Sequence, residues 1–185
     1  MSEAHEAGVV VDPVTGDRHV VLLGLMGAGK STIGRCLAND LQRPFVDSDL
    51  LVEVHHGSSP AELELREGLA RLHDAELETM RRVLVTRDSV VFAAAASVVD
   101  RVSADELQGA FAVWLDASPE ILAARIAGDH DRPALGSDPR AALRRQAEAR
   151  RPVARDLADL WIDVEQGDPK EISFRIAEAC RASDV

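Results

Sequence analysis

The sequence predicts a single α/β domain built on a parallel sheet, and three observations favour it. Short apolar runs alternate with longer stretches of helical spacing, and the 185 residues suit one domain with a sizeable core. No internal repeat or low-complexity linker divides the chain. Because short, mostly apolar runs are typical of parallel strands covered on both faces, we expect three layers, with a five-stranded parallel sheet between two layers of helices.

The expected elements alternate along the chain as such a domain requires. Apolar runs predict strands over residues 19–23, 44–46, 89–93, 112–115 and 160–164. Helical spacing predicts helices over residues 30–41, 50–55, 60–66, 69–86, 119–127, 139–156 and 169–181. Proline begins four of these helices, where a missing N–H is tolerated, and a candidate N-cap precedes each proline: Ser59, Ser118, Asp138 and Asp168.

Two segments lie outside this pattern. Residues 1–18 lack the basic and apolar regions of a secretory signal, and we expect them to form a flexible arm before a single domain at 19–185. Residues 128–137 are polar, are flanked by Gly128 and Gly136 and contain Arg132. A segment of this length inside a domain is either a lid over a site or a plain surface loop, and the residues alone leave both open.

Composition and charge exclude several classes of protein. The formal net charge is −11, from 21 basic and 32 acidic residues, which argues against binding to nucleic acids or anionic membranes. No apolar run reaches the roughly 18 residues of a transmembrane helix. The two cysteines, Cys36 and Cys180, lie far apart, as is usual in a reducing compartment for a protein without a zinc site. We expect a cytoplasmic monomer with a small-molecule substrate, and with neither nucleic acid nor membrane as a partner.

One motif predicts the chemistry. Residues 24–31, GLMGAGKS, fit the pattern G-x-x-x-x-G-K-[ST] and stand between a predicted strand and a predicted helix. Its glycines allow backbone N–H groups to point inward, and the helix that follows adds the positive end of its dipole. Lys30 can reach the β and γ phosphates of a nucleoside triphosphate, and the Ser31 hydroxyl can bind Mg²⁺. The residues expected around the phosphates are Gly27, Ala28, Gly29, Lys30, Ser31 and Thr32.

The rest of the sequence narrows this to a small-molecule kinase. No N-K-x-D or T-K-x-D stretch for reading guanine is present, and the chain is too small for a motor with a coupling domain. Asp47 and Asp49 follow the second predicted strand, at the edge where open α/β sheets bind ligands. Asp47 could hold Mg²⁺ through water, and Asp49 could orient a substrate hydroxyl or accept its proton. The structural alternative is that Asp49 caps the next helix.

Together these segments resemble the shikimate kinase family, which has the P-loop fold of nucleoside-monophosphate kinases. The resemblance covers about residues 19–182, where the phosphate motif, PFVDSDLLVE, HGSSPAELELREG, RPAL and EARRPV follow in the family's order. It implies transfer of the ATP γ-phosphoryl to a shikimate hydroxyl, with Mg²⁺ and a closing lid at 128–137, in aromatic amino acid biosynthesis.

The resemblance also implies roles for single residues. Asp49 matches the residue that contacts the acceptor hydroxyls, and Arg132 matches the lid arginine that stabilises transition-state charge. Arg150 matches an arginine that grips the substrate carboxylate. Arg125 matches a residue that stacks on adenine, and Pro169 lies near the adenine-contacting turn.

Departures from the family lie on the acceptor side. The family's Gly-Gly-Gly run is Ala94, Ala95 and Ala96 here, and a Cβ opposes both positive φ and close approach of the backbone. His73 stands where the family has a second carboxylate-binding arginine, and Glu64 where it has a phenylalanine. These changes favour an acceptor that is smaller or less anionic than shikimate, suited to Asp49, His73 and Arg150.

Three alternatives stay open at this stage. The protein could be an ordinary shikimate kinase whose site tolerates the changes. It could be a catalytically weak or inactive nucleotide-binding relative with a sensor or partner role. A nucleoside-monophosphate kinase has the same fold, although the D-x-D pair followed by HGSSPAELE resembles the shikimate branch more.

Overall fold

A parallel sheet forms the centre of the protein, as the sequence predicts. A computed structural model describes residues 18–127, 135–136 and 138–183. Its five parallel strands lie in the order β2-β3-β1-β4-β5, and their bounds are β1 His19–Gly24, β2 Phe45–Asp47, β3 Val91–Ala93, β4 Ala110–Asp116 and β5 Leu160–Asp163. All five predicted strands are present, and β4 begins two residues before its predicted start.

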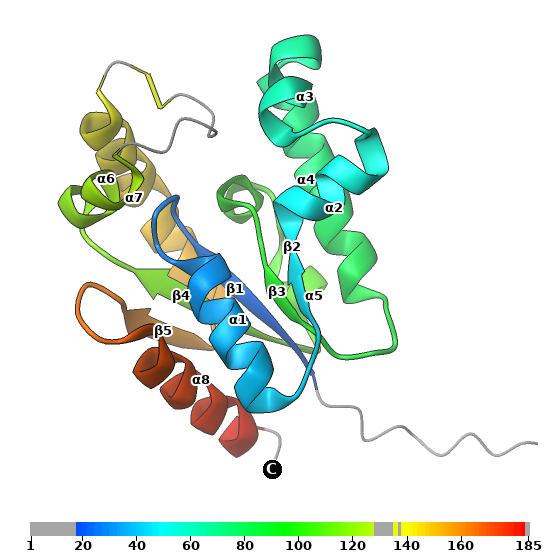
Figure 1. Cartoon of the computed structure of the whole chain (residues 1–185), viewed down its shortest axis with the longest axis vertical. Helices are drawn as coiled ribbons and strands as arrows, with labels where there is room; N and C mark the ends of the chain where they lie inside the picture. The colour runs from blue at the N-terminus through cyan, green and yellow to red at the C-terminus, as the bar shows by residue number, and fades with distance from the viewer. Residues whose placement is uncertain (1–17, 128–134, 137, 184–185) are drawn as a thin grey trace, which may run out of the picture.

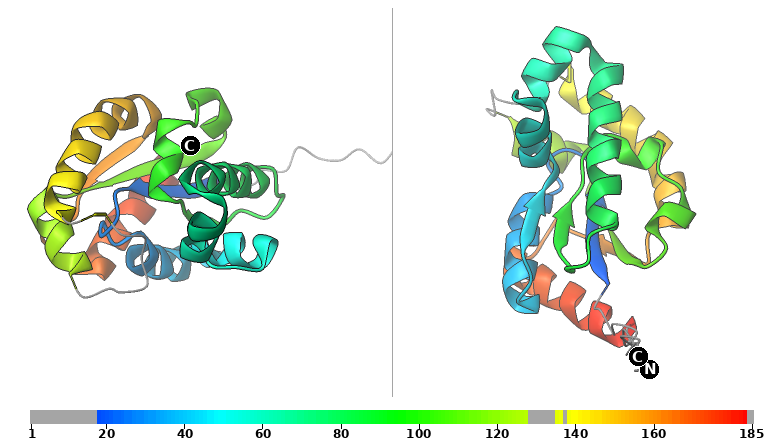
Figure 2. Two further views of the ribbon diagram at one scale, coloured as in Figure 1. Left: turned by 90° about the horizontal axis from the view of Figure 1, so that it is seen from above. Right: turned by 90° about the vertical axis from the view of Figure 1, so that its right-hand side faces the viewer.

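Helices cover both faces of this sheet, so the predicted three layers are confirmed (Figures 1 and 2). The seven predicted helices are α1 Lys30–Leu41, α2 Ser48–His56, α3 Pro60–Glu67, α4 Leu69–Leu84, α6 Pro119–Ile126, α7 Pro139–Leu157 and α8 Pro169–Ser183. Helices α1 and α8 pack together on one face, and α4 and α7 both contact the segment that follows β3. That segment contains two short elements that the sequence did not predict, the 3-10 helix η1 Ala96–Asp100 and the helix α5 Ala104–Leu107.

The proposed helix caps hold in part. Ser59 caps α3 in a reciprocal capping box with Glu62, and Asp138 accepts a hydrogen bond from the Ala141 N–H. Ser118 occupies the N-cap position of α6 as predicted, but its side chain makes no capping hydrogen bond. Side-chain capping bonds therefore help to fix the starts of α3 and α7.

The register of the strands decides where the site lies. Leu22 of β1 pairs with Ala93 of β3, and Gly24 pairs with Leu115 of β4, so these three strands end at one edge of the sheet. Asp47 pairs with Ala93 and brings the end of β2 to the same edge. The chain leaves this edge through the segments that carry the phosphate motif, the two aspartates and the alanine run.

Two predicted segments fall largely outside the described residues. The arm at 1–18 is represented by Arg18 alone, and the lid at 128–137 by Leu135 and Gly136. In the ranges that the structure describes, no helix combines the length and apolarity that a membrane span requires.

Gly34 shows how tightly α1 packs on the sheet. A Cβ at Gly34 would come within 2.5 Å of Phe45 Cε2 and 3.1 Å of Leu22 Cδ1. We expect Gly34→Val to lower the free energy of unfolding by about 1–3 kcal/mol, because the new side chain must displace buried neighbours. Urea denaturation followed by circular dichroism measures this, with Asn39→Val as the control on the exposed face of α1. Equal denaturation midpoints for the two variants would contradict the packing described.

Candidate active site

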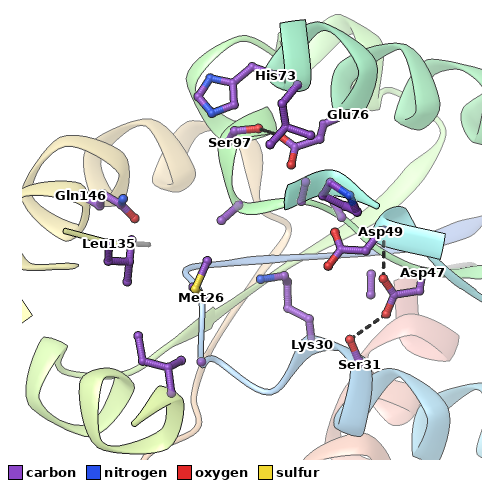
Figure 3. A pocket seen from close by; sticks show the side chains of 18 of the residues that line it. Met26, Lys30, Ser31, Asp47, Asp49, His73, Glu76, Ser97, Leu135 and Gln146 are labelled. Carbon is purple, nitrogen blue, oxygen red and sulfur yellow. Dashed lines mark hydrogen bonds between the residues drawn. The ribbon is translucent and has the colours of Figure 1, made fainter. Parts of the chain in front are cut away.

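A cavity of about 680 Å³ opens at the carboxyl edge of the sheet. It is lined by the phosphate loop, the start of α2, parts of α3 and α4, the segment after β3, and α6 and α7 (Figure 3). Most of the sequence-predicted site residues line it: Gly27, Gly29, Lys30, Ser31, Thr32, Asp47, Asp49, His73, Ala94, Ala95, Ala96, Arg125 and Arg150. The strand register therefore brings the predicted phosphate and acceptor residues into one space.

The phosphate loop is shaped to receive an anion. Gly27 and Gly29 have φ of 82° and 86°, a conformation that favours glycine, and a Cβ at Gly27 would lie 2.8 Å from the Leu122 carbonyl oxygen. Helix α1 begins at Lys30, and its N-cap Gly29 offers no side chain to satisfy the first-turn N–H groups. Lys30 Nζ donates hydrogen bonds to the carbonyl oxygens of Gly24 (2.9 Å) and Leu25 (3.1 Å). The amine and the N–H groups of the first turn of α1 provide a positive site for phosphates.

Asp47 binds the phosphate helix and the next helix at once. Its Oδ2 accepts a hydrogen bond from Ser31 Oγ at 2.7 Å, and its Oδ1 accepts one from the Asp49 N–H at 3.1 Å. Asp47 is thus the N-cap of α2, so the capping alternative considered for Asp49 was wrong. Asp49 lies in the first turn of α2, and its carboxylate points into the cavity toward Lys30 (Figure 3).

We call the side of the cavity that is lined by Asp49, Glu64, His73, Glu76, Ala94, Ala95, Ala96 and Arg150 the acceptor wall. It contains a buried carboxyl group for which the sequence predicts no role. Glu76 of α4 is buried and accepts a hydrogen bond from Ser97 of η1. Burial raises the pKa of Glu76 to about 7, and the nearby Asp49 carboxylate acts in the same direction. The hydrogen bond from Ser97 and the charges of Arg150 and Lys30 oppose the rise without cancelling it. Near neutral pH this carboxyl group is therefore available both as a donor and as an acceptor.

His73 lies on the same wall and carries no charge at neutral pH. Burial lowers its pKa, and the Arg150 guanidinium lowers it further. A neutral imidazole cannot supply the paired, charged hydrogen bonds that an arginine offers a carboxylate. This agrees with the expectation that His73 does not replace the arginine of the family.

Arg150 is placed as predicted, but its guanidinium already binds a carboxylate of this chain. Arg150 is buried, and its Nε and Nη2 donate to Asp100 Oδ1 at 2.9 Å and Asp100 Oδ2 at 2.6 Å. Nη1 donates to Gln146 Oε1 at 3.3 Å. No sequence pattern indicates Asp100 as the partner of Arg150, because the two residues lie 50 positions apart along the chain.

The alanine run reaches the cavity without left-handed backbone. Among the described residues, Gln42 is the one non-glycine residue with positive φ, so Ala94, Ala95 and Ala96 avoid that strain. Ala95 has φ −60° and ψ 147°, and η1 begins at the next residue. The three methyl groups therefore form part of the cavity wall where the family has bare backbone.

Of the two residues expected at the nucleotide base, Arg125 and Pro169, one lines the cavity. Arg125 lines the cavity, and its Nη2 donates to the Val164 carbonyl oxygen at 2.6 Å. Pro169 begins α8 and is absent from the cavity lining, and Ala28 is buried beneath the loop. Arg132 lies outside the described residues, whereas Leu135 from the same predicted lid lines the cavity.

Comparison with known proteins identifies the family. The sequence profile described as shikimate kinase matches residues 26–181. This chain belongs to the shikimate kinase family. A shikimate kinase of Symbiobacterium thermophilum is 37% identical over 164 residues, which cover 86% of this chain and 94% of that enzyme. A shikimate kinase of Moorella thermoacetica is 36% identical over 168 residues, which cover 89% of this chain and 95% of that enzyme.

The fold agrees with a solved structure of the same family. A shikimate kinase from Acinetobacter baumannii, in complex with shikimate, superposes with a TM-score of 0.84 at 28% identity and covers 90% of this chain and 94% of that one. The predicted P-loop kinase fold is thereby confirmed. As a member of this family, the protein is an ATP-using phosphotransferase whose acceptor is an alcohol group.

The raised pKa of Glu76 predicts how stability varies with pH. Between pH 4.5 and about 7 the folded protein retains a proton that the unfolded chain has lost, so stability falls as pH rises through this window. Glu76→Gln removes this term. We expect the unfolding free energy of the variant, measured relative to that of the wild type, to increase by about 2–3 kcal/mol when the pH is raised from about 5 to about 8. Urea denaturation at several pH values measures the difference.

The exposed Glu78, two residues along α4, provides the control for that experiment. Glu78→Gln removes an exposed carboxyl group and leaves Glu76 in place. Its difference in unfolding free energy from the wild type should therefore not grow toward high pH as that of Glu76→Gln does. A difference for Glu76→Gln that stays constant from acid to alkaline pH would show that the pKa of Glu76 is the same in the folded and unfolded states, which contradicts the raised pKa.

Proposed function

We propose that this protein transfers the γ-phosphoryl group of ATP, with Mg²⁺, to a hydroxyl of shikimate or a related small polyol. The single observation that carries the proposal is the arrangement of Lys30 and Asp49, which face each other across one cavity (Figure 3). Lys30 belongs to the phosphate loop, and Asp49 begins the acceptor side. A phosphate and a hydroxyl bound beside these two groups would be adjacent.

The reaction needs placement and charge neutralisation more than covalent chemistry from the protein. The bond between the γ-phosphorus and the β–γ bridging oxygen breaks, and its electron pair leaves on ADP. The acceptor oxygen forms the new bond to phosphorus, and its proton passes to the Asp49 carboxylate. Lys30 and the N–H groups at the start of α1 stabilise the negative charge on the phosphoryl oxygens. Arg132 is proposed to add a further positive charge, and Arg125 and Pro169 to hold the base.

Oxygen donors suited to Mg²⁺ lie beside the phosphate loop. The Ser31 hydroxyl and the Asp47 carboxylate are 2.7 Å apart, and hydroxyl and carboxylate oxygens are ligands that Mg²⁺ prefers. Within the described ranges, no three His, Cys, Asp or Glu side chains gather into a metal site, so the nucleotide phosphates would complete the coordination. When bound there, Mg²⁺ supplies charge neutralisation at the phosphates.

The proposal extends to the type of substrate, the partners, the cellular location and the oligomeric state of the protein. The substrate is a small molecule, because the cavity of about 680 Å³ suits one. The net charge of −11 disfavours nucleic acids and anionic membranes as partners. We infer that the enzyme acts as a cytoplasmic monomer.

A second function is favoured by one observation on the acceptor side. The engagement of Arg150 by Asp100 removes a cation that would otherwise be free to hold an acceptor. If no acceptor binds productively, the protein is a weak or inactive nucleotide-binding relative with a sensor or partner role. The presence of both Lys30 and Asp49 in the cavity favours the kinase function over this alternative.

A coupled ADP-release assay with ATP, Mg²⁺ and a panel of hydroxylated acceptors tests the proposal. We expect acceptor-dependent ADP release that falls about 100-fold or more in Lys30→Met, because a positioned charge at the transferred phosphoryl is lost. Asp49→Asn should fall by a similar factor, because the proton acceptor is lost. Arg87→Met is the control, since Arg87 is exposed at the opposite edge of the sheet.

The same assay separates the two functions. ATP binding by calorimetry, together with no acceptor-dependent turnover across the panel, would support the nucleotide-binding relative and refute the kinase. Wild-type rates in Lys30→Met would refute the site itself.

A further inference from the structure

Arg150 and Asp100 form a bidentate ion pair at the acceptor wall. The two side chains meet along the Nε–Nη2 edge of the guanidinium, with donor–acceptor distances of 2.9 and 2.6 Å. Two parallel, charge-assisted bonds of this kind are the strongest arrangement that an arginine makes with a carboxylate. The edge of Arg150 that would receive an acceptor carboxylate side-on is therefore already used.

The backbone at Asp100 is held in place by buried neighbours, while the Asp100 side chain itself is 43% exposed. It ends η1, whose Val98 and Val99 are buried in the main core. The next residue, Arg101, forms an ion pair of 2.6 Å with Asp74 of α4. Because η1 also contacts α4 and α7, the backbone that carries Asp100 is packed against the elements that carry Arg150 and Glu76, and the Asp100 carboxylate is held by Arg150. A rotation of one side chain away from the pair would leave the buried Arg150 without its partner, which is costly.

The remaining groups on this wall make it unfavourable for a negative charge. The described cations that line the cavity are Lys30 and Arg125, which both lie against the phosphate loop, and Arg150. Once Arg150 is neutralised by Asp100, the acceptor end presents the acidic side chains of Asp49 and Glu64, together with Glu76 and His73, neither of which supplies a positive charge. A carboxylate brought here would face like charges and find no unneutralised cation on this wall.

Hydroxyl groups suit the same wall. A hydroxyl can donate to the Asp49 carboxylate, and it can both donate to and accept from a protonated carboxyl group such as Glu76. The methyl groups of Ala94, Ala95 and Ala96 add an apolar surface against which a carbon ring can pack.

We propose that the acceptor is a small polyol without a negative charge, and that Asp100 sets this selectivity by occupying Arg150. The inference rests on the proposed kinase function, since it names the acceptor of that same site. Asp100 is a positioning residue, because it acts through Arg150 and takes no part in the transfer.

Two matched pairs of acceptors test this on the wild-type enzyme. Shikimate and shikimamide share their hydroxyl groups and differ in carrying a carboxylate or a carboxamide, and glucuronate and glucuronamide form a second pair. We expect kcat/KM for the amide to exceed that for the acid by about tenfold or more in whichever pair is turned over, mainly through KM. A preference for the acid would overturn the inference and leave the kinase function standing. No turnover of any acceptor, with ATP bound, would overturn the kinase function itself.

Variants then test the role of Asp100. In Asp100→Asn the acid should gain about tenfold in kcat/KM, whereas the amide should change little, because only the acid meets the released charge of Arg150. A purely structural role would weaken both acceptors alike and leave their ratio unchanged, which would refute the assignment. Asp88→Asn, at the opposite edge of the sheet, is the control for loss of one acidic charge. Thermal melting checks folding, and Asp100→Ser is the second variant if Asp100→Asn does not fold.

Discussion

The two halves of the site depend on one carboxylate. Asp47 accepts the Ser31 hydroxyl with one oxygen and the Asp49 N–H with the other, so it joins the phosphate helix α1 to the acceptor helix α2. Its position follows from the register of β2 on β3, which places Asp47 beside Ala93 at the edge of the sheet. These two hydrogen bonds connect the start of α2, and therefore the position of Asp49, to the phosphate loop. The distance between phosphate and acceptor is thus set by backbone pairing and one side chain.

The phosphate side could be predicted almost completely from the sequence, because its geometry is local. The loop between Gly24 and Ser31 is continuous, and its glycines and its helix start fix the conformation without distant partners. The helices were equally predictable where periodicity runs for several turns. The elements η1 and α5 were missed because five and four residues are too few to show a period, and the run ASVVD is compatible with an extended strand end.

The acceptor side could be predicted only in part, because its contacts are made between distant segments. The family resemblance indicated Arg150 and His73, but not the partners that determine their charge. Asp100 is 50 residues from Arg150, and Ser97 is 21 residues from Glu76, so neither pair leaves a pattern in the sequence. The alternative that Asp49 caps α2 was wrong because the helix boundary was misplaced. The helix starts two residues before its predicted start, which makes Asp47 the capping residue and frees Asp49 to face the cavity.

The unusual residues of the acceptor wall are best understood together. Burial raises the pKa of Glu76 to about 7, and the Asp49 carboxylate acts in the same direction, so this carboxyl group keeps its proton to near neutral pH. A buried guanidinium cannot lose its proton, so Arg150 needs a carboxylate partner, and Asp100 provides it. One group is neutralised by a retained proton and the other by an ion pair. His73 and Asp100 therefore act in the same direction, since His73 supplies no positive charge and Asp100 neutralises that of Arg150. An acceptor that brought its own negative charge would disturb both arrangements, whereas an uncharged polyol disturbs neither.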